Sequence, residues 1–584
     1  MKFLRNLLAA ILGTMIAWGL LFFLFAGIGA AMGSKEKVVV KPSSVLTLKL
    51  SGDVKDYVPK SDNPFDQIFK DVNPQFQLSE VLTAIDNAMT DDNIKGISIE
   101  LDQSRIGMAQ LQALRDKLIE FKSSGKFIGA FADSYSQKSY YLSSVADSIF
   151  INPVGILEFK GLTSEKLYFK DFQEKYGVKM EVIRHGKYKS AMEGFISDKM
   201  SDANREQTLS FLSSIWGEFL EDIGQSRGKS VDELNKVADN LGTKTNALAV
   251  DNHMIDGVLY IDQYRDKLVS WSGVESMDDL NMITMKHYLK SGKGRNASSA
   301  SDKVAVLYAQ GEIKYGKGDE TFIGQEAMIK AIRKIKKDKK IKALVLRVNS
   351  PGGSGLASDI ILRELELLKQ EKPLVVSMGN LAASGGYYIA CKADKIYAEP
   401  TTITGSIGVF GAMPNVNGLA KNMGINAEQV TTNKAPGYSI FEPMNQAFHD
   451  EMKGMIDNFY QIFITHVAEG RNMTKEAVDA VAQGRVWTGK EAQDIGLVDE
   501  LGSLNDAVSH AASIAGLDSY KTTAYPRYKK DIEDVFKGNP FMTSKADMLK
   551  ETLGEENYQI YQTIENFKQM EGVQARMPYE LVIR

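Results

Sequence analysis

The sequence predicts an α/β protein made of two tandem copies of one unit, each built on a mainly parallel sheet. The first observation is an internal repeat, because residues 94–96 (Ile-Lys-Gly) match residues 341–343 (Ile-Lys-Ala) at a spacing of 247 positions. Tyr140-Tyr141 recurs at Tyr387-Tyr388 with the same spacing. The second observation is that strand-like and helix-like runs alternate along each copy. This alternation is typical of right-handed βαβ crossovers.

The N-terminal segment predicts one transmembrane helix. Residues 7–33 carry no charged side chain, and about 20 such residues span a bilayer. The apolar region of a cleavable signal peptide is shorter, about 7–15 residues. We therefore expect an uncleaved anchor, although Ala-Ala-Met-Gly at 30–33 also permits cleavage. Basic residues lie on both sides of the span, so the charge rule leaves its orientation open; they are Lys2, Arg5, Lys35, Lys37 and Lys41.

Each copy then begins with an alternating strand and continues as strand, helix, strand, helix. In the first copy we expect strands at 45–50, 96–101 and 127–131, with a helix at 108–122. In the second copy we expect strands at 304–308, 343–348 and 374–378, a helix at 358–370 and another from about residue 384.

These runs divide the chain into five parts. The polar, small-residue stretch near 290–301 separates the two copies. Residues 532–574 are typical of one or two amphipathic helices, which would cap the second copy, join subunits or form a solvated tail. The predicted parts are a stub, anchor and linker at 1–42, the first repeat at 43–289, the linker at 290–302, the second repeat at 303–511 and a helical extension at 512–584.

Composition narrows the classes of function. The 584 residues carry a formal charge of −4, with 43% hydrophobic and 25% charged residues, as in an ordinary globular protein. The chain has no broad excess of basic residues, so its composition does not favour nucleic-acid binding. The single cysteine, Cys391, excludes an internal disulfide framework and a cysteine zinc site, and we expect it to be a small buried apolar residue. We predict no metal and no cofactor.

The second copy carries residues suited to nucleophilic catalysis. Gly352 and Gly353 follow a strand and a proline, so their N–H groups can turn toward an oxyanion. Ser384 begins a helix and precedes Gly385, which favours an exposed hydroxyl and a further N–H donor. The first copy lacks this set, with Arg105-Ile106 in place of the glycine pair and Gln137 in place of the serine.

A serine hydroxyl needs a base, and the first copy offers the candidates. A lysine serves when burial favours its neutral form, and Ser-Lys pairs are a known variant. Lys187, Lys189 and His185 lie together in the first copy, and residue chemistry leaves all three open, whereas the position that matches Lys189 in the second copy is Pro436. Ser406, on a glycine-rich turn, is a candidate to hydrogen-bond the amine. The site is thus predicted to be divided between the copies.

Three ordered motifs of the second copy resemble the signal peptide peptidase A (protease IV) family in its long, duplicated form. They are Ser-Pro-Gly-Gly at 350–353, Ala-Ser-Gly-Gly-Tyr-Tyr at 383–388 and Thr-Gly-Ser-Ile-Gly at 404–408. Residues 188–195 are similar to the family's lysine motif, although Gly194 stands where the family often has proline, and 484–489 and 496–502 are similar to a later signature. The resemblance implies Ser384 as nucleophile, Lys189 as general base and Ser406 as the residue that orients the lysine. It also implies a ClpP/crotonase-like fold for each repeat.

The resemblance further implies where and on what the protein acts. It predicts a single-pass protein of the bacterial cytoplasmic membrane, with catalytic domains on the outer face and a ring-like homo-oligomer, commonly a tetramer. The implied substrates are cleaved signal peptides and other apolar peptides, and the implied partner besides peptide is membrane lipid. Two alternatives stay open: a crotonase-type acyl-CoA enzyme, which shares a paired-glycine loop, and a non-catalytic membrane scaffold.

Overall fold

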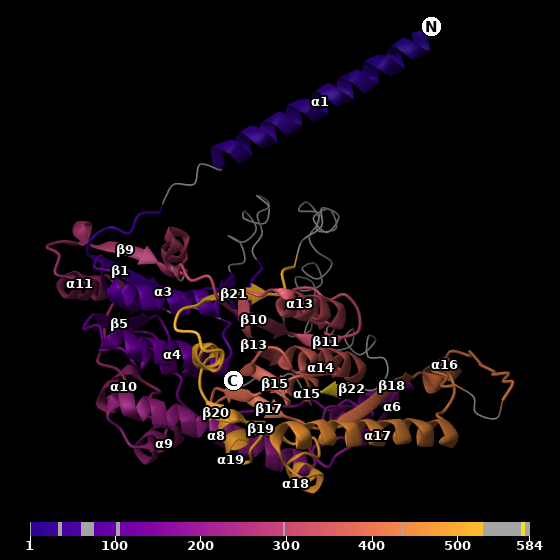
Figure 1. Ribbon diagram of the computed structural model, residues 1–584. Coiled ribbons are helices and arrows are strands. Elements are labelled where there is room, and N and C mark those ends of the chain that lie inside the picture. The colour runs from indigo at the N-terminus through magenta and orange to yellow at the C-terminus, as the bar shows by residue number, and fades with distance from the viewer. Residues whose placement is uncertain are drawn as a thin grey trace.

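The computed structural model describes residues 2–32, 38–59, 75–100, 105–295, 298–433, 437–528 and 574–577. Helix α1 (Lys2–Met32) projects away from the folded body (Figure 1). Within the described residues, Arg5–Phe23 is the one stretch of helix long and apolar enough to cross a membrane, with a mean hydropathy of 1.9 and no part of it buried. The length and composition of this stretch are those of a membrane-spanning helix, and a signal sequence has them as well.

The first repeat contains a six-stranded sheet in which all neighbouring strands are parallel. Their order is β8-β6-β5-β4-β1-β9. The strands are β1 (Ser44–Leu48), β4 (Ile94–Ile99), β5 (Phe127–Ala132), β6 (Ser148–Ile151), β8 (Gly257–Val258) and β9 (Asn281–Thr284). Helices include α3 (Leu78–Thr90), α4 (Met108–Lys122), α5 (Gln137–Ser143), α8 (Asp202–Arg227), α9 (Val231–Asp239), α10 (Asn246–Asp251) and α11 (Ile261–Ser272).

The second repeat repeats this order as β20-β16-β15-β13-β10-β21 and adds two strands. The strands are β10 (Lys303–Gln310), β13 (Ile341–Ser350), β15 (Leu374–Ala383), β16 (Lys395–Ala398), β17 (Ile403–Gly405), β19 (Val486–Thr488), β20 (Glu500–Leu501) and β21 (Lys521–Tyr525). Its helices include α13 (Gln325–Lys337), α14 (Gly355–Lys369), α15 (Gly385–Tyr388), α17 (Gln446–Arg471), α18 (Lys475–Val481), α19 (Gly489–Asp494) and α20 (Leu504–Ile514). The prediction of a duplicated α/β fold with mainly parallel sheets is confirmed.

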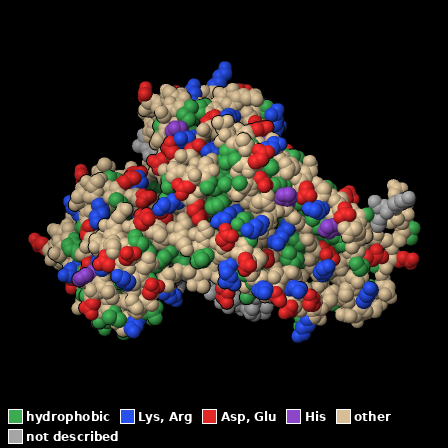
Figure 2. Space-filling model, turned by 90° about the horizontal axis from the view of Figure 1, so that it is seen from below, with side chains coloured by type: hydrophobic (Ala, Val, Ile, Leu, Met, Phe, Trp, Pro, Cys, Tyr) green, Lys and Arg blue, Asp and Glu red, His purple; other side chains and the backbone are tan. Residues whose placement is uncertain are grey.

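The sheets form because their central strands are almost wholly apolar. Such runs suit strands covered by helices on both faces. Ile97 and Ile99 of β4, and Leu344 and Leu346 of β13, have no exposed surface. Figure 2 shows acidic and basic side chains interspersed over one outer face of the molecule, in keeping with the small net charge.

A third sheet joins the repeats, in the order β12-β11-β14-β22-β18-β7. Its strands are β7 (Lys179–His185), β11 (Glu312–Lys314), β12 (Phe322–Gly324), β14 (Gly352–Ser354), β18 (Val409–Asn415) and β22 (Gln574–Arg576). Only β7 comes from the first repeat, and it runs antiparallel to β18 from His185 opposite Val409 to Lys179 opposite Asn415. A segment of the first repeat is therefore built into the second.

The C-terminal extension differs from the helical prediction where the structure describes it. The predicted boundary at residue 511 falls inside α20, and β21 pairs in parallel with β10 as the edge strand of the second sheet. Gln574, the last residue of the predicted helical stretch, belongs instead to β22. Both differences arise because β21 and β22 pair with the edges of strands that lie far away in the sequence. The remainder of the predicted helices, 532–573, lies outside the described residues.

A buried ion pair also connects the repeats. Asp56 follows β2 (Asp53–Lys55), which pairs with β3 (Gln75–Gln77) in the first repeat. Its carboxylate lies 2.8 Å from the guanidinium of Arg347 on β13, and both side chains are at most 2% exposed. The amides of Asn349 and Gln110 also donate to Asp56. Two charges so deeply buried depend on each other, since neither has water available as a substitute partner.

We expect Asp56→Ala to lower the free energy of unfolding by about 3–5 kcal/mol, because it leaves the Arg347 charge buried and unpaired. Urea unfolding measures the change. The matched control is Asp53→Ala, which removes an ion pair whose Arg105 partner is 70% exposed, and we expect it to cost less than about 1 kcal/mol. Equal losses in the two variants would contradict a special role for the buried pair.

Candidate active site

Ser384 lies at the sharp turn where β15 passes into α15. Its backbone has φ 55° and ψ −114°, an uncommon conformation for a residue with a side chain. The N–H of Ser384 donates to the carbonyl of Gly405 at 2.8 Å, which holds the turn. The side chain has no exposed surface. A positive φ at a buried serine is the kind of backbone strain that clusters at functional sites.

Lys189 reaches Ser384 from the other repeat. It lies on the segment 161–200, called the arm below, which contains α6 (Lys170–Tyr176), β7 and α7 (Glu193–Ile196). Because β7 pairs with β18, the chain after His185 enters the second repeat. There the Nζ of Lys189 donates to the Oγ of Ser384 at 2.9 Å. The structure thus brings together two residues that are 195 positions apart.

The surroundings of Lys189 favour its uncharged form. The side chain is 1% exposed, and burial lowers the pKa of its amine well below the ordinary value. None of the ion pairs found among the described residues includes Lys189. A neutral amine that contacts a hydroxyl can accept its proton, so this pair is able to generate a nucleophilic oxygen.

Ser406 also contacts the amine of Lys189. Lys189 Nζ donates to both the backbone carbonyl and the Oγ of Ser406, each at 3.1 Å. Ser406 has a φ of 49°, and its N–H donates to the carbonyl of Arg485 at 2.6 Å. The three contacts of the amine therefore come from two serines, both held in strained, buried turns.

The glycines border the same space. Gly352 and Gly353 have φ values of 97° and 152°, which favour glycine. A Cβ atom on Gly352 would lie 2.7 Å from the nitrogen of Gly385, so these two glycines are neighbours beside Ser384. Gly353 packs instead against β11, where a Cβ atom would lie 2.0 Å from the carbonyl of Ile313. No side chain can be added at Gly352 or Gly353 without displacing backbone.

The other two candidate bases lie elsewhere. His185 stacks on Tyr460 at 3.9 Å between ring centroids and bonds to Asp457 at 2.7 Å. Lys187 is exposed, and its Nζ contacts the hydroxyl of Tyr188 at 3.4 Å. Of the three, only Lys189 points toward Ser384.

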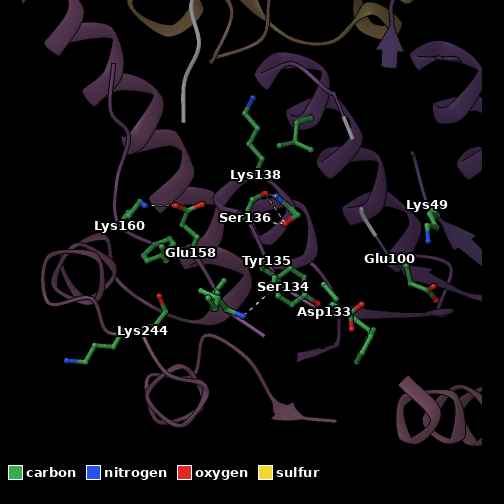
Figure 3. A pocket seen from close by; sticks show the side chains of 18 of the residues that line it. Lys49, Glu100, Asp133, Ser134, Tyr135, Ser136, Lys138, Glu158, Lys160 and Lys244 are labelled. Atoms are coloured by element: carbon green, nitrogen blue, oxygen red, sulfur yellow. Dashed lines mark hydrogen bonds and ion pairs between the residues drawn. The ribbon is translucent and has the colours of Figure 1, made fainter. Parts of the chain in front are cut away.

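The first repeat has a pocket where its own site would be. It encloses about 1010 Å³ and is lined by residues that include Ser136 and Lys138, the positions on either side of Gln137 (Figure 3). Gln137 donates from its amide to the carbonyl of Gly161 at 2.9 Å. The matching contact in the second repeat is that of Ser384 Oγ with the carbonyl of Gly408, at 3.5 Å. The backbones of the two repeats differ here, because Ser384 precedes α15 with a φ of 55° whereas Gln137 is the first residue of α5, and the first repeat has no hydroxyl at this position.

Two glycines that sequence reasoning did not assign to the site make room for the lysine. A Cβ atom on Gly484 would lie 2.6 Å from the Cβ of Lys189, and one on Gly408 would lie 3.2 Å from its Cδ. The N–H of Tyr188 donates to the carbonyl of Gln483 at 2.8 Å, which fixes the arm against the loop before Gly484. The motif Gly-Arg-Val-Trp-Thr-Gly at 484–489 was the available signal, although nothing in it reveals a contact with residue 189.

The chain is similar to known peptidases over both repeats. The model of peptidase family S49 matches residues 120–275 and 366–518, one range in each repeat. Protease 4 of Haemophilus influenzae is 34% identical over 510 residues, which cover 85% of this chain and 83% of that protein. The chloroplastic serine protease SPPA of Arabidopsis thaliana is 30% identical over 92% of this chain and 78% of its own length. Among solved structures, a ClpP1 mutant of Listeria monocytogenes is 16% identical, with a TM-score of 0.23, over 35% of this chain and 94% of that one.

Proposed function

The chain belongs to peptidase family S49 and is a serine peptidase, and on that premise we propose that Ser384 is its nucleophile and Lys189 its general base. One observation carries the proposal: a buried amine, with its pKa lowered by burial, donates to the serine hydroxyl at 2.9 Å. Ser406 orients the amine through its Oγ and its carbonyl. Because the chain belongs to this family, a serine peptidase replaces the acyl-CoA enzyme and the non-catalytic scaffold as the predicted function.

In the proposed mechanism, the neutral amine of Lys189 takes the proton of Ser384 while Oγ attacks a peptide carbonyl. The N–H groups of Gly385 and Gly353, with Gly352 beside them, stabilise the negative charge that forms on the carbonyl oxygen. Lys189 then gives the proton to the leaving amine. Water hydrolyses the acyl-enzyme ester with Lys189 again as the base.

We further propose that the protein is anchored by α1 and acts on cleaved signal peptides and other apolar peptides outside the cytoplasmic membrane. The apolar stretch Arg5–Phe23 supports the anchor. The motif resemblance to signal peptide peptidase A supports the substrates, the outer location and a homotetramer. The repeated parallel sheets support a ClpP/crotonase-like fold for each half.

The test is acylation by a serine-reactive inhibitor, mapped by mass spectrometry and timed across a pH series. We expect modification at Ser384. The rate should rise with pH while Lys189 loses its proton and level off above the lysine pKa, because only the neutral amine accepts a proton. Since burial lowers that pKa, the plateau should begin below the free lysine value of about 10.4. Modification at another residue, or a rate still rising at that pH, would count against the proposal.

A further inference from the structure

The pocket of the first repeat lies at the carboxyl ends of its parallel strands, which is where open α/β sheets bind their ligands. Lys49 follows β1, Glu100 follows β4 and Asp133 follows β5, and all three line the pocket. Its volume of about 1010 Å³ is at the upper end of the range of about 300–1,000 Å³ that is typical of ligand sites. The mechanism proposed for Ser384 and Lys189 makes no use of this pocket.

This pocket is the counterpart of the candidate active site in the other repeat. The bridge between Tyr135 and Leu157 matches the pairing of Ala382 with Thr404 in the second repeat, each residue at the repeat spacing of 247 positions. In the second repeat this pairing lies at the end of β15, directly before Ser384. The strand framework that flanks the candidate site is therefore also present in the repeat that has no nucleophile.

Lys138, which lines the pocket, differs from its counterpart in charge. By the same spacing it stands at the position of Gly385, whose N–H is proposed to stabilise an oxyanion. A backbone N–H contributes only a dipole, whereas a lysine ammonium carries a full positive charge and three donors. The exchange suits a ligand that is already an anion when it binds, in place of a carbonyl that becomes one during a reaction.

Lys138 has no acidic partner in the part of the chain that the structure describes. It is half-buried, and burial lowers the pKa of its amine with no carboxylate to offset the effect. Two other basic residues of the pocket are already paired, Lys160 with Glu158 at 2.5 Å and Arg265 with Glu100 at 2.6 Å. In Figure 3, Lys160 points toward Glu158, whereas Lys138 points away from both. A bound carboxylate would supply the partner that Lys138 lacks.

The rest of the lining joins a positive charge to apolar surface. Apart from the two ion pairs, the charged side chains are Lys49, Lys138, Lys244 and Asp133, and Asp133 accepts from the amide of Asn152 at 3.0 Å. Apolar side chains beside them are open to solvent, and burial of such surface by a ligand is favourable; they are Ile156, Leu241 and Ile261, which are 63%, 51% and 43% exposed. The pocket therefore fits a ligand that combines apolar groups with a negative charge.

We propose that the pocket of the first repeat binds the C-terminal end of an apolar peptide without cleaving it, with Lys138 paired to the terminal carboxylate. A serine peptidase creates such ends, because each cut releases a fragment with a new carboxylate. This inference rests on the proposed function, which assigns the oxyanion role to Gly385. The residues that line the pocket include none of the candidate active site, so a fragment held there leaves Ser384 open to the next substrate.

Peptide binding to the full-length Ser384→Ala protein tests this proposal, because that variant does not consume the probe. The probe is a short peptide of alternating alanine and leucine, labelled at its N-terminus, that ends either in a free carboxylate or in an amide. We expect fluorescence anisotropy to show about tenfold tighter binding of the carboxylate form, the size of effect that a hydrogen bond between charged groups provides. Added to this variant, Lys138→Gln should give both forms the same affinity. The matched control is Lys95→Gln, which changes an exposed lysine of β4 outside the pocket and should preserve the difference.

A second measurement locates the bound peptide. A photoreactive residue beside its free carboxylate should form crosslinks, mapped by mass spectrometry, to the lining of the first repeat, such as Ser136 or Leu157. Crosslinks confined to the second repeat would overturn the proposal, as would a preference for the carboxylate form that survives Lys138→Gln. A fatty acid that displaces the labelled peptide as well as the unlabelled peptide does would overturn the assignment of the ligand to a peptide.

Failure of this inference differs from failure of the proposed function. If the wild type hydrolyses an apolar peptide in a Ser384-dependent reaction while the carboxylate and amide forms bind equally to Ser384→Ala, the pocket proposal is overturned and the proposed function stands. Peptide hydrolysis that persists in Ser384→Ala would instead overturn the dyad.

Discussion

Ser384→Ala is expected to lower kcat for peptide hydrolysis by about 10⁴–10⁶, because removal of a nucleophile from a serine peptidase leaves only the contribution of the oxyanion hole and substrate binding. The substitution removes one oxygen at a turn whose backbone is fixed by the bond from Ser384 N–H to Gly405. The fold should therefore persist. Steady-state hydrolysis of an apolar peptide measures the effect, with circular dichroism as a check on folding.

The control for this variant is Ser98→Ala in the first repeat. Ser98 is also fully buried, and its hydroxyl bonds to Tyr264 and Glu100, both residues of the first repeat. It should retain peptide hydrolysis. A Ser384→Ala protein that keeps wild-type activity would rule out Ser384 as the nucleophile.

Lys189→Ala is expected to cause a loss of similar size, because the nucleophile and its base act as one unit and their effects do not add. Without the amine, the hydroxyl of Ser384 has no base to accept its proton. The same peptide assay measures kcat, and the double variant with Ser384→Ala should be no slower than either single variant.

Lys187→Ala provides the comparison, since it removes the same side chain two residues away. Lys187 is exposed and contacts Tyr188 instead of Ser384, so its loss should change kcat less than about threefold. A larger loss from Lys187→Ala than from Lys189→Ala would reverse the assignment of the base. This pair of variants decides between two residues that residue chemistry alone leaves open.

The order of strands and helices could be predicted because it depends on local periodicity. Helix 108–122 was expected and found as Met108–Lys122, and the strand expected at 127–131 was found as Phe127–Ala132. Other boundaries depend on partners that are distant in the chain. Strand β15 continues past Met378 to Ala383 because Leu381–Ala383 pairs with β17, which the local pattern does not reveal.

The candidate site could likewise be predicted only where the local sequence determines it. Ser384 and the glycine pair could be identified from the sequence, because their backbone needs small residues at fixed spacing. The choice of Lys189 was not available from residue chemistry, because it depends on the pairing of β7 with β18. Strand β22 gave no signal at all, since it is three residues long and its partners β14 and β18 lie in the second repeat. The catalytic roles stay predictions until the variants are measured.

The division of the site between repeats has a consequence for synthesis of the protein. The ribosome completes Lys189 first, and Ser406 follows 217 positions later. At about 5–20 residues per second, this delay is roughly 10–40 seconds. Until Ser384 and Ser406 have been added, the nascent chain carries Lys189 without the two serines that contact it. Under the proposed dyad, we expect a chain that terminates before Ser384 to be inert toward other newly made polypeptides. Under the proposed dyad of Ser384 and Lys189, peptidase activity arises only in molecules whose translation has passed through both halves.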